Sequence, residues 1–253
     1  MKTLQLGDRE VPRIGLGTNQ LRHTPENAAF LRDAVAAGLG HIDTAHLYAG
    51  GESEETIGAA GVAGEAVVAT KGGFNAGEGR PDLLREQIEE SLRRLRTETI
   101  DLYYLHRVHP DPPLEDSLRV IAEYREVGKI RHVGISEVAI EQIERARESV
   151  PIAAVQNRYN LSDRQWDDEV DYCGGEGIVF VPFFPLRGES AAVGEIAARH
   201  GATPHQIMLA WLLRRSPTML PIPGTLSLEH LKENLAALEI ELDDSEFEKL
   251  SGG

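Results

Sequence analysis

The segment HIDTAHLYAGGESEETIG, residues 41–58, carries an aspartate and a tyrosine of the kind that enzymes use to move protons. Asp43 ends a short apolar run, and Tyr48 follows five residues later in a stretch loosened by Gly50 and Gly51. A tyrosine hydroxyl can donate a proton to a reacting oxygen, and a carboxylate can hold a cationic partner in place. Two such side chains that leave one strand end indicate a reaction site.

Two more chemically useful side chains end apolar runs farther along the chain. Lys71 ends VVATK, directly before Gly-Gly, and His106 ends DLYYLH. A lysine ammonium at the end of a buried strand is costly unless it is paired, and Asp43 is the natural partner. Taken singly, these residues have ordinary structural explanations, such as a cap for Asp43 or a structural role for His106. Four such types at three successive strand ends indicate one functional site rather than four separate structural residues.

The elements that carry these residues alternate between apolar strand-like runs and amphipathic helical stretches. The expected strands cover residues 13–17, 40–43, 66–70, 100–105, 130–136, 152–156, 178–183 and 218–222. The expected helices cover residues 25–37, 53–60, 81–95, 114–127, 138–146, 164–173, 190–200, 203–215 and 227–238. Strands that are apolar on both faces and alternate with helices are typical of a parallel sheet covered by helices. Eight such units in 253 residues predict an α/β protein, a (β/α)8 TIM barrel, as one domain over residues 1–253.

A doubly wound open sheet is the alternative architecture, and it usually carries G-x-G-x-x-G after its first strand. Here the first barrel-like strand is followed by GLGTNQL, which lacks that spacing. The segment KTLQLGDREVP predicts a β-hairpin with Gly7 and Asp8 at its turn. We expect this hairpin to plug the bottom of the barrel. Chemistry in such barrels lies at the C-terminal ends of the strands, where the four residues above are expected.

Composition narrows the classes of partner and compartment. The net charge is −15, from 26 basic and 41 acidic residues, which argues against nucleic acid or an anionic membrane as the main partner. The single cysteine, Cys173, excludes an intrachain disulfide, and no apolar run approaches the ~20 residues of a membrane span. MKTLQLGDRE lacks the apolar core of a signal peptide. We therefore expect a cytoplasmic protein that acts on a small molecule, with a monomer as the default because no coiled-coil pattern is present.

Several segments together resemble the aldo-keto reductase family. The matching segments, in chain order, are RIGLGT, HIDTAHLYAGGESEETIG, VVATKGG, IDLYYLHR, GKIRHVGIS, VQNRYNL and IPGTLSLEHLKENL. The resemblance extends over almost the whole chain and is greatest to small bacterial members of the family. It implies reduction of an aldehyde or ketone to an alcohol, with NADPH as the cofactor and NADH as a second option.

The resemblance assigns catalytic roles to Asp43, Tyr48, Lys71 and His106. Tyr48 gives a proton to the carbonyl oxygen. The Lys71 ammonium eases that transfer by favouring the anionic form of the phenol, and Asp43 keeps Lys71 charged and oriented. His106 hydrogen-bonds the carbonyl oxygen and fixes its direction. This scheme uses no metal ion.

The same resemblance implies a set of ligand contacts. Ser136 and Gln156 match residues that bind the nicotinamide carboxamide, and Phe183 matches an aromatic that stacks on its ring; a plain core position is the alternative for Phe183. Thr225 and Ser227 open a helix whose N–H groups suit the 2′-phosphate of NADP. The expected cofactor residues are Ser136, Glu137, Gln156, Phe183, Pro185, Leu186, Gly188, Pro223, Gly224, Thr225, Ser227, His230, Glu233 and Asn234. The expected substrate-pocket residues are Asn19, His46, Phe74 and Arg107.

The chain departs from the family pattern at four places. Glu137 stands where the family often has asparagine, and it adds negative charge near the nicotinamide. Gly224 and His230 stand where many relatives have lysine or arginine, which weakens the case for NADP over NAD. Asn19 stands where some relatives have a large aromatic residue. The connections after the first, third and seventh strands are short, and the last of these leaves few residues to cover the pyrophosphate: Arg187, Gly188 and Ser190.

Two other functions stay open on the sequence alone. A nucleotide-binding regulatory or sensor protein with little turnover would keep the same four residues. A metal-dependent hydrolase or lyase would use His41, Asp43, His46 and His106, because HIDTAH offers two histidines and an aspartate at close spacing. Strand-borne histidine ligands elsewhere are lacking, which counts against the metal-dependent alternative.

Overall fold

The computed structural model describes residues 2–252, and its strands form a hairpin and a parallel sheet. The hairpin pairs β1 (Thr3–Leu6) with β2 (Arg9–Pro12). In the parallel sheet each strand is bonded to the next in chain order. Its strands are β3 (Leu16–Gly17), β4 (His41–Asp43), β5 (Val67–Gly72), β6 (Ile100–Leu105), β7 (Ile130–Ser136), β8 (Ile152–Gln156) and β9 (Val179–Phe180).

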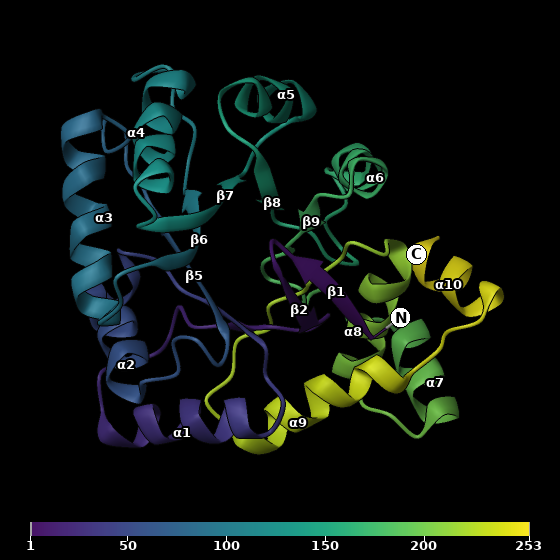
Figure 1. Ribbon diagram of the computed structural model, residues 1–253. Coiled ribbons are helices and arrows are strands. Elements are labelled where there is room, and N and C mark those ends of the chain that lie inside the picture. Colours follow the sequence, from purple (N-terminus) through teal and green to yellow (C-terminus); the bar gives the residue numbers. More distant parts are fainter. Residues whose placement is uncertain (1, 253) are drawn as a thin grey trace.

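Helices surround the sheet as an outer ring, and the last of them, residues 244–251, packs on the helices of residues 191–200 and 204–215 (Figure 1). Their bounds are α1 (Pro25–Ala36), α2 (Glu52–Ala60), α3 (Pro81–Leu95), α4 (Leu114–Glu126), α5 (Ile140–Ser149), α6 (Asp167–Glu176), α7 (Ala191–His200), α8 (Pro204–Arg215), α9 (Leu228–Ala236) and α10 (Asp244–Ser251). The apolar stripe expected on residues 81–95 is buried against the sheet at Leu84, Ile88, Leu92 and Leu95. In the part of the chain that the structure describes, no helix combines the length and apolar character needed to cross a bilayer.

The eighth position of the barrel is filled by residues 218–224, which do not form the regular strand expected over 218–222. Phe180 of β9 donates its N–H to the carbonyl of Thr218 and accepts from the N–H of Leu220, at 3.0 and 2.9 Å. On the other side, the carbonyls of Pro221 and Pro223 accept from Gly15 and Gly17 at 2.9 and 3.3 Å. Pro221 and Pro223 have no N–H to donate, so they contribute only acceptors to the pairing with β3, and Gly224 continues it as a parallel bridge with Gly17. The ring of strands is nevertheless closed, as expected for a (β/α)8 barrel.

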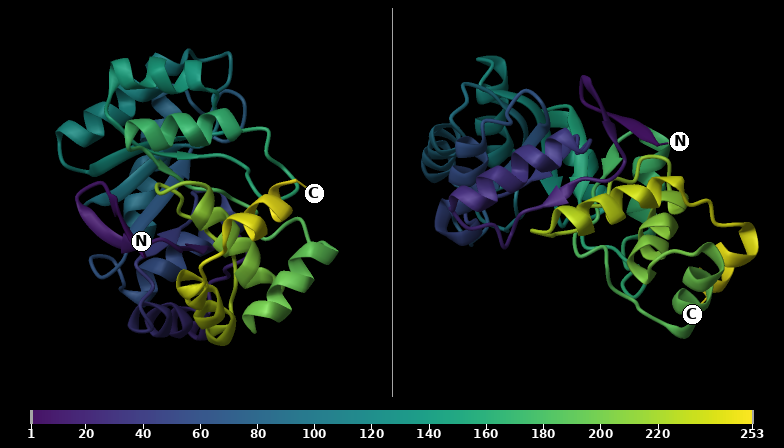
Figure 2. Two further views of the ribbon diagram at one scale, coloured as in Figure 1. Left: turned by 90° about the vertical axis from the view of Figure 1, so that its right-hand side faces the viewer. Right: turned by 90° about the horizontal axis from the view of Figure 1, so that it is seen from below.

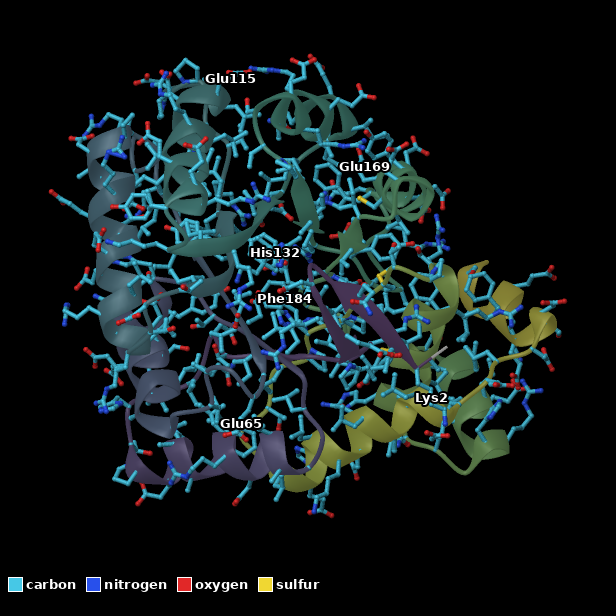
Figure 3. All side chains as sticks on the ribbon, in the orientation of Figure 1. Lys2, Glu65, Glu115, His132, Glu169 and Phe184 are labelled. Atoms are coloured by element: carbon cyan, nitrogen blue, oxygen red, sulfur yellow. The ribbon has the colours of Figure 1, made fainter. Side chains whose placement is uncertain are left out.

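The hairpin closes one end of this barrel, as the sequence predicts. Leu4, Leu6 and Val11 are buried in one apolar cluster with residues of the barrel interior, namely Val67, Ala69, Leu102, Tyr104, Ala154, Val179, Val181, Leu220 and Ile222. Both views of Figure 2 show the hairpin at one side of the molecule. At its turn, the side chain of Asp8 contacts His132 of β7, with 2.8 Å between Oδ1 and Nε2. His132 lies beside the hairpin in Figure 3. The opposite end of the barrel, at the C-terminal ends of the strands, is not covered by the hairpin and can hold a functional site.

Candidate active site

A cavity of about 490 Å³ lies at the C-terminal ends of the strands. The predicted residues that line it are Asn19, Asp43, Tyr48, Phe74, His106, Arg107, Ser136, Gln156, Phe183, Pro185, Gly224 and Thr225. Arg187, which the sequence suggests for the pyrophosphate, lines it as well. Residues without a predicted role also line it: Gly17, Thr18, Gln20, Leu21, Leu47, Phe184, Ile222 and Leu226. The cavity is therefore formed by loops from β3, β4, β5, β6 and β9, by the ends of β7 and β8, and by the segment before α9.

Lys71 lies directly beneath this cavity and is completely buried. Its Nζ donates to Asp43 Oδ1 at 2.6 Å and to the carbonyl of Thr44 at 2.8 Å. The adjacent strands β4 and β5 bring the two side chains together, because Asp43 pairs with Ala69 and Lys71 follows two residues later. The predicted Asp43–Lys71 pair is thus present as a buried ion pair.

The electrostatic balance around Lys71 keeps its ammonium charged. Burial alone would lower the pKa of Lys71, but the Asp43 carboxylate, followed by Tyr48, outweighs burial and raises that pKa. The Lys71 ammonium also lies 5.1 Å from the centre of the Tyr48 ring. A permanent cation therefore faces the phenol that is expected to lose a proton.

Tyr48 is held in place by a sharply turned loop. It opens a 3₁₀ turn, Tyr48–Gly51, and donates its N–H to the carbonyl of Ala45 at 3.0 Å. Gly51 has φ +104°, and a Cβ there would lie 2.3 Å from the Arg94 guanidinium carbon. Arg94 in turn donates to the carbonyl of His46 at 3.0 Å. Glycine is thus required at position 51 both for backbone conformation and to admit the arginine that anchors the loop.

His106 follows β6 and faces the same cavity as Tyr48, with 6.2 Å between the ring centres. Burial, followed by the positive charges of Lys71 and Arg107, lowers the pKa of His106 to about 2. Its Nδ1 is buried and has no hydrogen-bond partner among residues 2–252. A proton on Nδ1 would be an unsatisfied donor, so we assign the proton to Nε2. The neutral ring then presents one N–H donor for a ligand oxygen.

Acid should destabilise the protein through His106. The unfolded chain takes up a proton on this imidazole near pH 6.5, whereas the folded chain resists protonation until about pH 2, so stability falls as pH drops below 6.5. When the pH falls from 7 to 5, the free energy of unfolding of His106→Gln should decrease by about 2 kcal/mol less than that of the parent protein. Urea unfolding at both pH values measures this difference. The half-buried His109→Gln serves as control. An equal acid effect in parent and His106→Gln would contradict the assignment.

Ser136 and Gln156 end neighbouring strands and are joined through the backbone. Ser136 Oγ donates to the carbonyl of Gln156 at 2.7 Å. Gln156 Nε2 donates to Asp43 Oδ2 at 2.8 Å, across the barrel from β8 to β4. The second Asp43 oxygen is therefore satisfied by an amide that the sequence suggested only for a nicotinamide. Both side chains line the cavity, so a ligand contact remains compatible with these bonds.

Glu137 serves a local structural purpose. It has φ +56°, and its Oε1 accepts the backbone N–H of Arg158 at 2.7 Å. The side chain thereby fastens the loop after β7 to the loop after β8, and it does not line the cavity. The sequence did not indicate this contact between the Glu137 carboxylate and the backbone N–H of Arg158.

Two phenylalanines form one wall of the cavity. Phe183 packs against the apolar cluster inside the barrel, and its ring centre lies 5.3 Å from that of Phe184. Phe184 is 49% exposed, and Figure 3 places it inside the ring of surrounding elements. Neither ring is a plain core residue, because both line the cavity. They provide a flat apolar face of the kind on which an aromatic ligand can stack.

Several predicted ligand residues do not line the cavity. His46 instead contacts Glu90 of α3, with 2.9 Å between Nε2 and Oε2, because its side chain leaves the loop toward the outer helices. At the start of α9, Thr225 Oγ1 accepts the N–H of Ser227, and Ser227 Oγ accepts that of His230. These bonds already satisfy two N–H groups of the expected phosphate site. The other predicted residues outside the cavity lining are Leu186, Gly188, Pro223, Glu233 and Asn234.

The residues of the metal-dependent alternative do not converge. His41 Nδ1 lies 3.1 Å from the carbonyl oxygen of Val67, inside the barrel, while His46 faces Glu90. Asp43 is engaged by Lys71 and Gln156. Among residues 2–252 no three or more His, Cys, Asp or Glu side chains are grouped to hold a metal ion.

One protein family and several known proteins are similar to this chain. The model of the Aldo/keto reductase family matches residues 13–192 and 189–252. Pyridoxine 4-dehydrogenase of Escherichia coli (strain K12) is 35% identical over 280 residues, which covers 99% of this chain and 97% of that protein. This alignment is longer than the 253-residue chain, so the bacterial protein has residues that this chain lacks.

Solved structures share the fold over the full length. A thermostable aldo-keto reductase in complex with the inhibitor epalrestat is 34% identical with a TM-score of 0.91, covering 100% of this chain and 99% of that one. An aldo/keto reductase from Klebsiella pneumoniae in complex with NADP and acetate is 31% identical with a TM-score of 0.90. That match covers 99% of this chain and 94% of the Klebsiella chain.

Proposed function

Because the chain belongs to the aldo/keto reductase family, we propose that it uses NADPH to reduce an aldehyde or ketone to an alcohol. One observation carries this proposal: Tyr48 and a neutral His106 face one cavity directly above the buried Asp43–Lys71 pair. The barrel closes through residues 218–224, and the family model matches both parts of the chain, so we also propose that residues 1–253 act as one domain.

The donor set of the cavity fits a nicotinamide cofactor. Phe183 offers an aromatic face, Ser136 and Gln156 offer polar groups beside it, and Arg187 offers positive charge for a phosphate. NADP is the ligand of the Klebsiella relative. When bound, NADPH supplies the hydride that reaches the carbonyl carbon.

The chain's own residues then manage the carbonyl oxygen. His106 donates its Nε2–H to that oxygen and fixes its direction, while Tyr48 gives it the proton. The Lys71 ammonium stabilises the negative charge that the departing proton leaves on Tyr48. Asp43 holds this ammonium in place through the 2.6 Å contact.

The direct test is NADPH oxidation by the purified protein with benzaldehyde, with benzyl alcohol measured as the product. We expect one alcohol per NADPH consumed and no effect of a chelator. Retained NADPH binding without alcohol would favour the sensor function instead. Activity lost in chelator and restored by a metal would favour the metal-dependent alternative.

Preference for NADPH over NADH should be modest in this protein and open to improvement at His230. His230 is exposed in the first turn of α9, and its position lacks the fixed charge of arginine. We expect His230→Arg to lower KM for NADPH about 5-fold and to leave KM for NADH unchanged, since only NADPH carries the 2′-phosphate. Val127→Arg adds charge at a position that is 72% exposed, beyond α4, and is the control. Equal changes for both cofactors would argue against a phosphate site at α9.

A further inference from the structure

The cavity carries positive charge in a protein whose net charge is −15. Its only lining carboxylate among the described residues is Asp43, which is paired with Lys71. His106 is neutral, which leaves Arg107 and Arg187 as the charged groups that face a ligand. Within residues 2–252 neither arginine forms an ion pair with a carboxylate. Two unneutralised cations in one cavity of an acidic protein indicate a ligand with more than one anionic group.

Arg107 is held in a defined position beside the reacting groups. Its guanidinium carbon lies 5.4 Å from the ring centre of Phe74 and 6.0 Å from that of Phe183. Its Nη1 donates to the carbonyl of His106 at 3.2 Å and to Ser136 Oγ at 3.4 Å. A guanidinium that contacts two rings and is anchored through one nitrogen has already lost much of its freedom before a ligand arrives.

The other edge of the guanidinium remains available. Among the described residues, Nε and Nη2 of Arg107 have no hydrogen-bond partner, and these two N–H groups form the side-on fork that matches two oxygens of an oxyanion. A purely structural arginine would usually use this fork within the protein. The Nε and Nη2 N–H groups of Arg107 are therefore available to an oxyanion that enters the cavity.

The location of Arg107 favours the substrate over the cofactor as its ligand. The Phe74 ring that it contacts also lies 4.8 Å from the His106 ring, next to the donor for the carbonyl oxygen. Arg187, by contrast, follows Pro185 in the loop after β9, which we assign to the cofactor phosphates. The two cations thus belong to different parts of the cavity.

We infer that Arg107 binds an anionic group of the carbonyl substrate, so the preferred substrates are aldehydes or ketones that also bear a carboxylate or a phosphate. This inference rests on the proposed function. The oxyanion bridges Nε and Nη2 of Arg107, while the carbonyl oxygen lies between His106 and Tyr48. The rings of Phe74 and Phe183 flank the guanidinium and reduce competition from water for the charge.

The test compares 4-formylbenzoate with its neutral methyl ester and with 4-formylphenyl phosphate. For the parent protein we expect kcat/KM at least tenfold higher for an anionic aldehyde than for the ester, although the ester is the more electrophilic. The ratio of kcat/KM for 4-formylbenzoate to that for 4-formylphenyl phosphate shows which oxyanion the site prefers. Arg107→Gln should lower kcat/KM for the anionic aldehydes at least tenfold, mainly through KM, and change the ester less than threefold.

Matched variants separate this site from a structural role. Arg107→Lys keeps the charge without the fork and should retain part of the preference. Arg158→Gln removes an equal charge near Phe184, outside the cavity lining, and should keep the parent's ratio of anionic to neutral substrate. Arg107→Gln should also leave KM for NADPH unchanged.

Three outcomes would overturn the inference alone. Equal kcat/KM for the ester and the anionic aldehydes in the parent protein would argue against an anion site at Arg107 and would still support the reductase activity. An equal loss on all substrates in Arg107→Gln would assign the residue a structural role. A rise in KM for NADPH with an unchanged substrate ratio would assign it to the cofactor. Absence of turnover with every aldehyde would instead overturn the proposed function, and the inference with it.

Discussion

Tyr48→Phe is expected to lower kcat for aldehyde reduction by about 100- to 10,000-fold while NADPH binding stays nearly unchanged. The substitution removes one hydroxyl and keeps the ring, whose centre lies 5.1 Å from the Lys71 ammonium. The backbone turn does not depend on that hydroxyl, because it is fixed by the bond from Tyr48 N–H to Ala45 and by Arg94. Without the Tyr48 hydroxyl, no group in the same position can give a proton to the product oxygen.

Single-turnover kinetics with saturating NADPH measure this loss, and fluorescence titration measures the dissociation constant of the NADPH complex. Tyr172→Phe is the matched control, since that hydroxyl accepts from Arg147 on the outer surface at 2.7 Å. A loss of less than tenfold in Tyr48→Phe would mean that another group, with His106 as the first candidate, supplies the proton. A matching loss of NADPH affinity would mean that the hydroxyl serves the cofactor.

The fold could be predicted from the sequence because barrel strands and their helices repeat a pattern that local residues determine. The spacing of Leu84, Ile88, Leu92 and Leu95 is sufficient to define the buried face of α3. The eighth strand, expected over 218–222, does not form as a regular strand, because Pro221 within that run and Pro223 directly after it have no N–H to donate. Helix α10 was missed, although Asp243 and Glu246 form a capping box at its start.

The site was partly predictable for a physical reason. The cost of burying the Lys71 ammonium requires a nearby carboxylate, so the pair with Asp43 could be inferred from two adjacent strand ends. The bond from Gln156 to Asp43 could not, since it joins residues 113 positions apart across the barrel. The side chains of His46 and Glu137 were equally unpredictable, because loop conformation rather than strand alternation sets their direction. Leu47 and Phe184 were missed for the same reason.

Lys71→Met is expected to abolish measurable reduction and to destabilise the fold by about 3–5 kcal/mol. The variant removes the cation that faces Tyr48 and leaves the Asp43 carboxylate buried with Gln156 as its remaining side-chain partner. The raised pKa of Lys71 means that its contribution to stability is complete below its ordinary value near 10.5 and is lost only in stronger alkali. The destabilisation should therefore be nearly constant from pH 7 to pH 9, unlike the acid effect of His106.

A double-mutant cycle separates the cost of the unpaired carboxylate from the loss of chemistry. Asp43→Asn combined with Lys71→Met removes both charges, and the new amide oxygen can still accept from Gln156. We expect the double variant to be more stable than Lys71→Met in urea unfolding, because it no longer buries an unpaired carboxylate. It should remain as inactive as Lys71→Met, because proton transfer requires the Lys71 ammonium. Equal stability of the two variants would show that Asp43 does not depend on Lys71 for its burial. Recovered activity would show that the ammonium does not assist Tyr48, and the proposed proton transfer would then need a different source of charge.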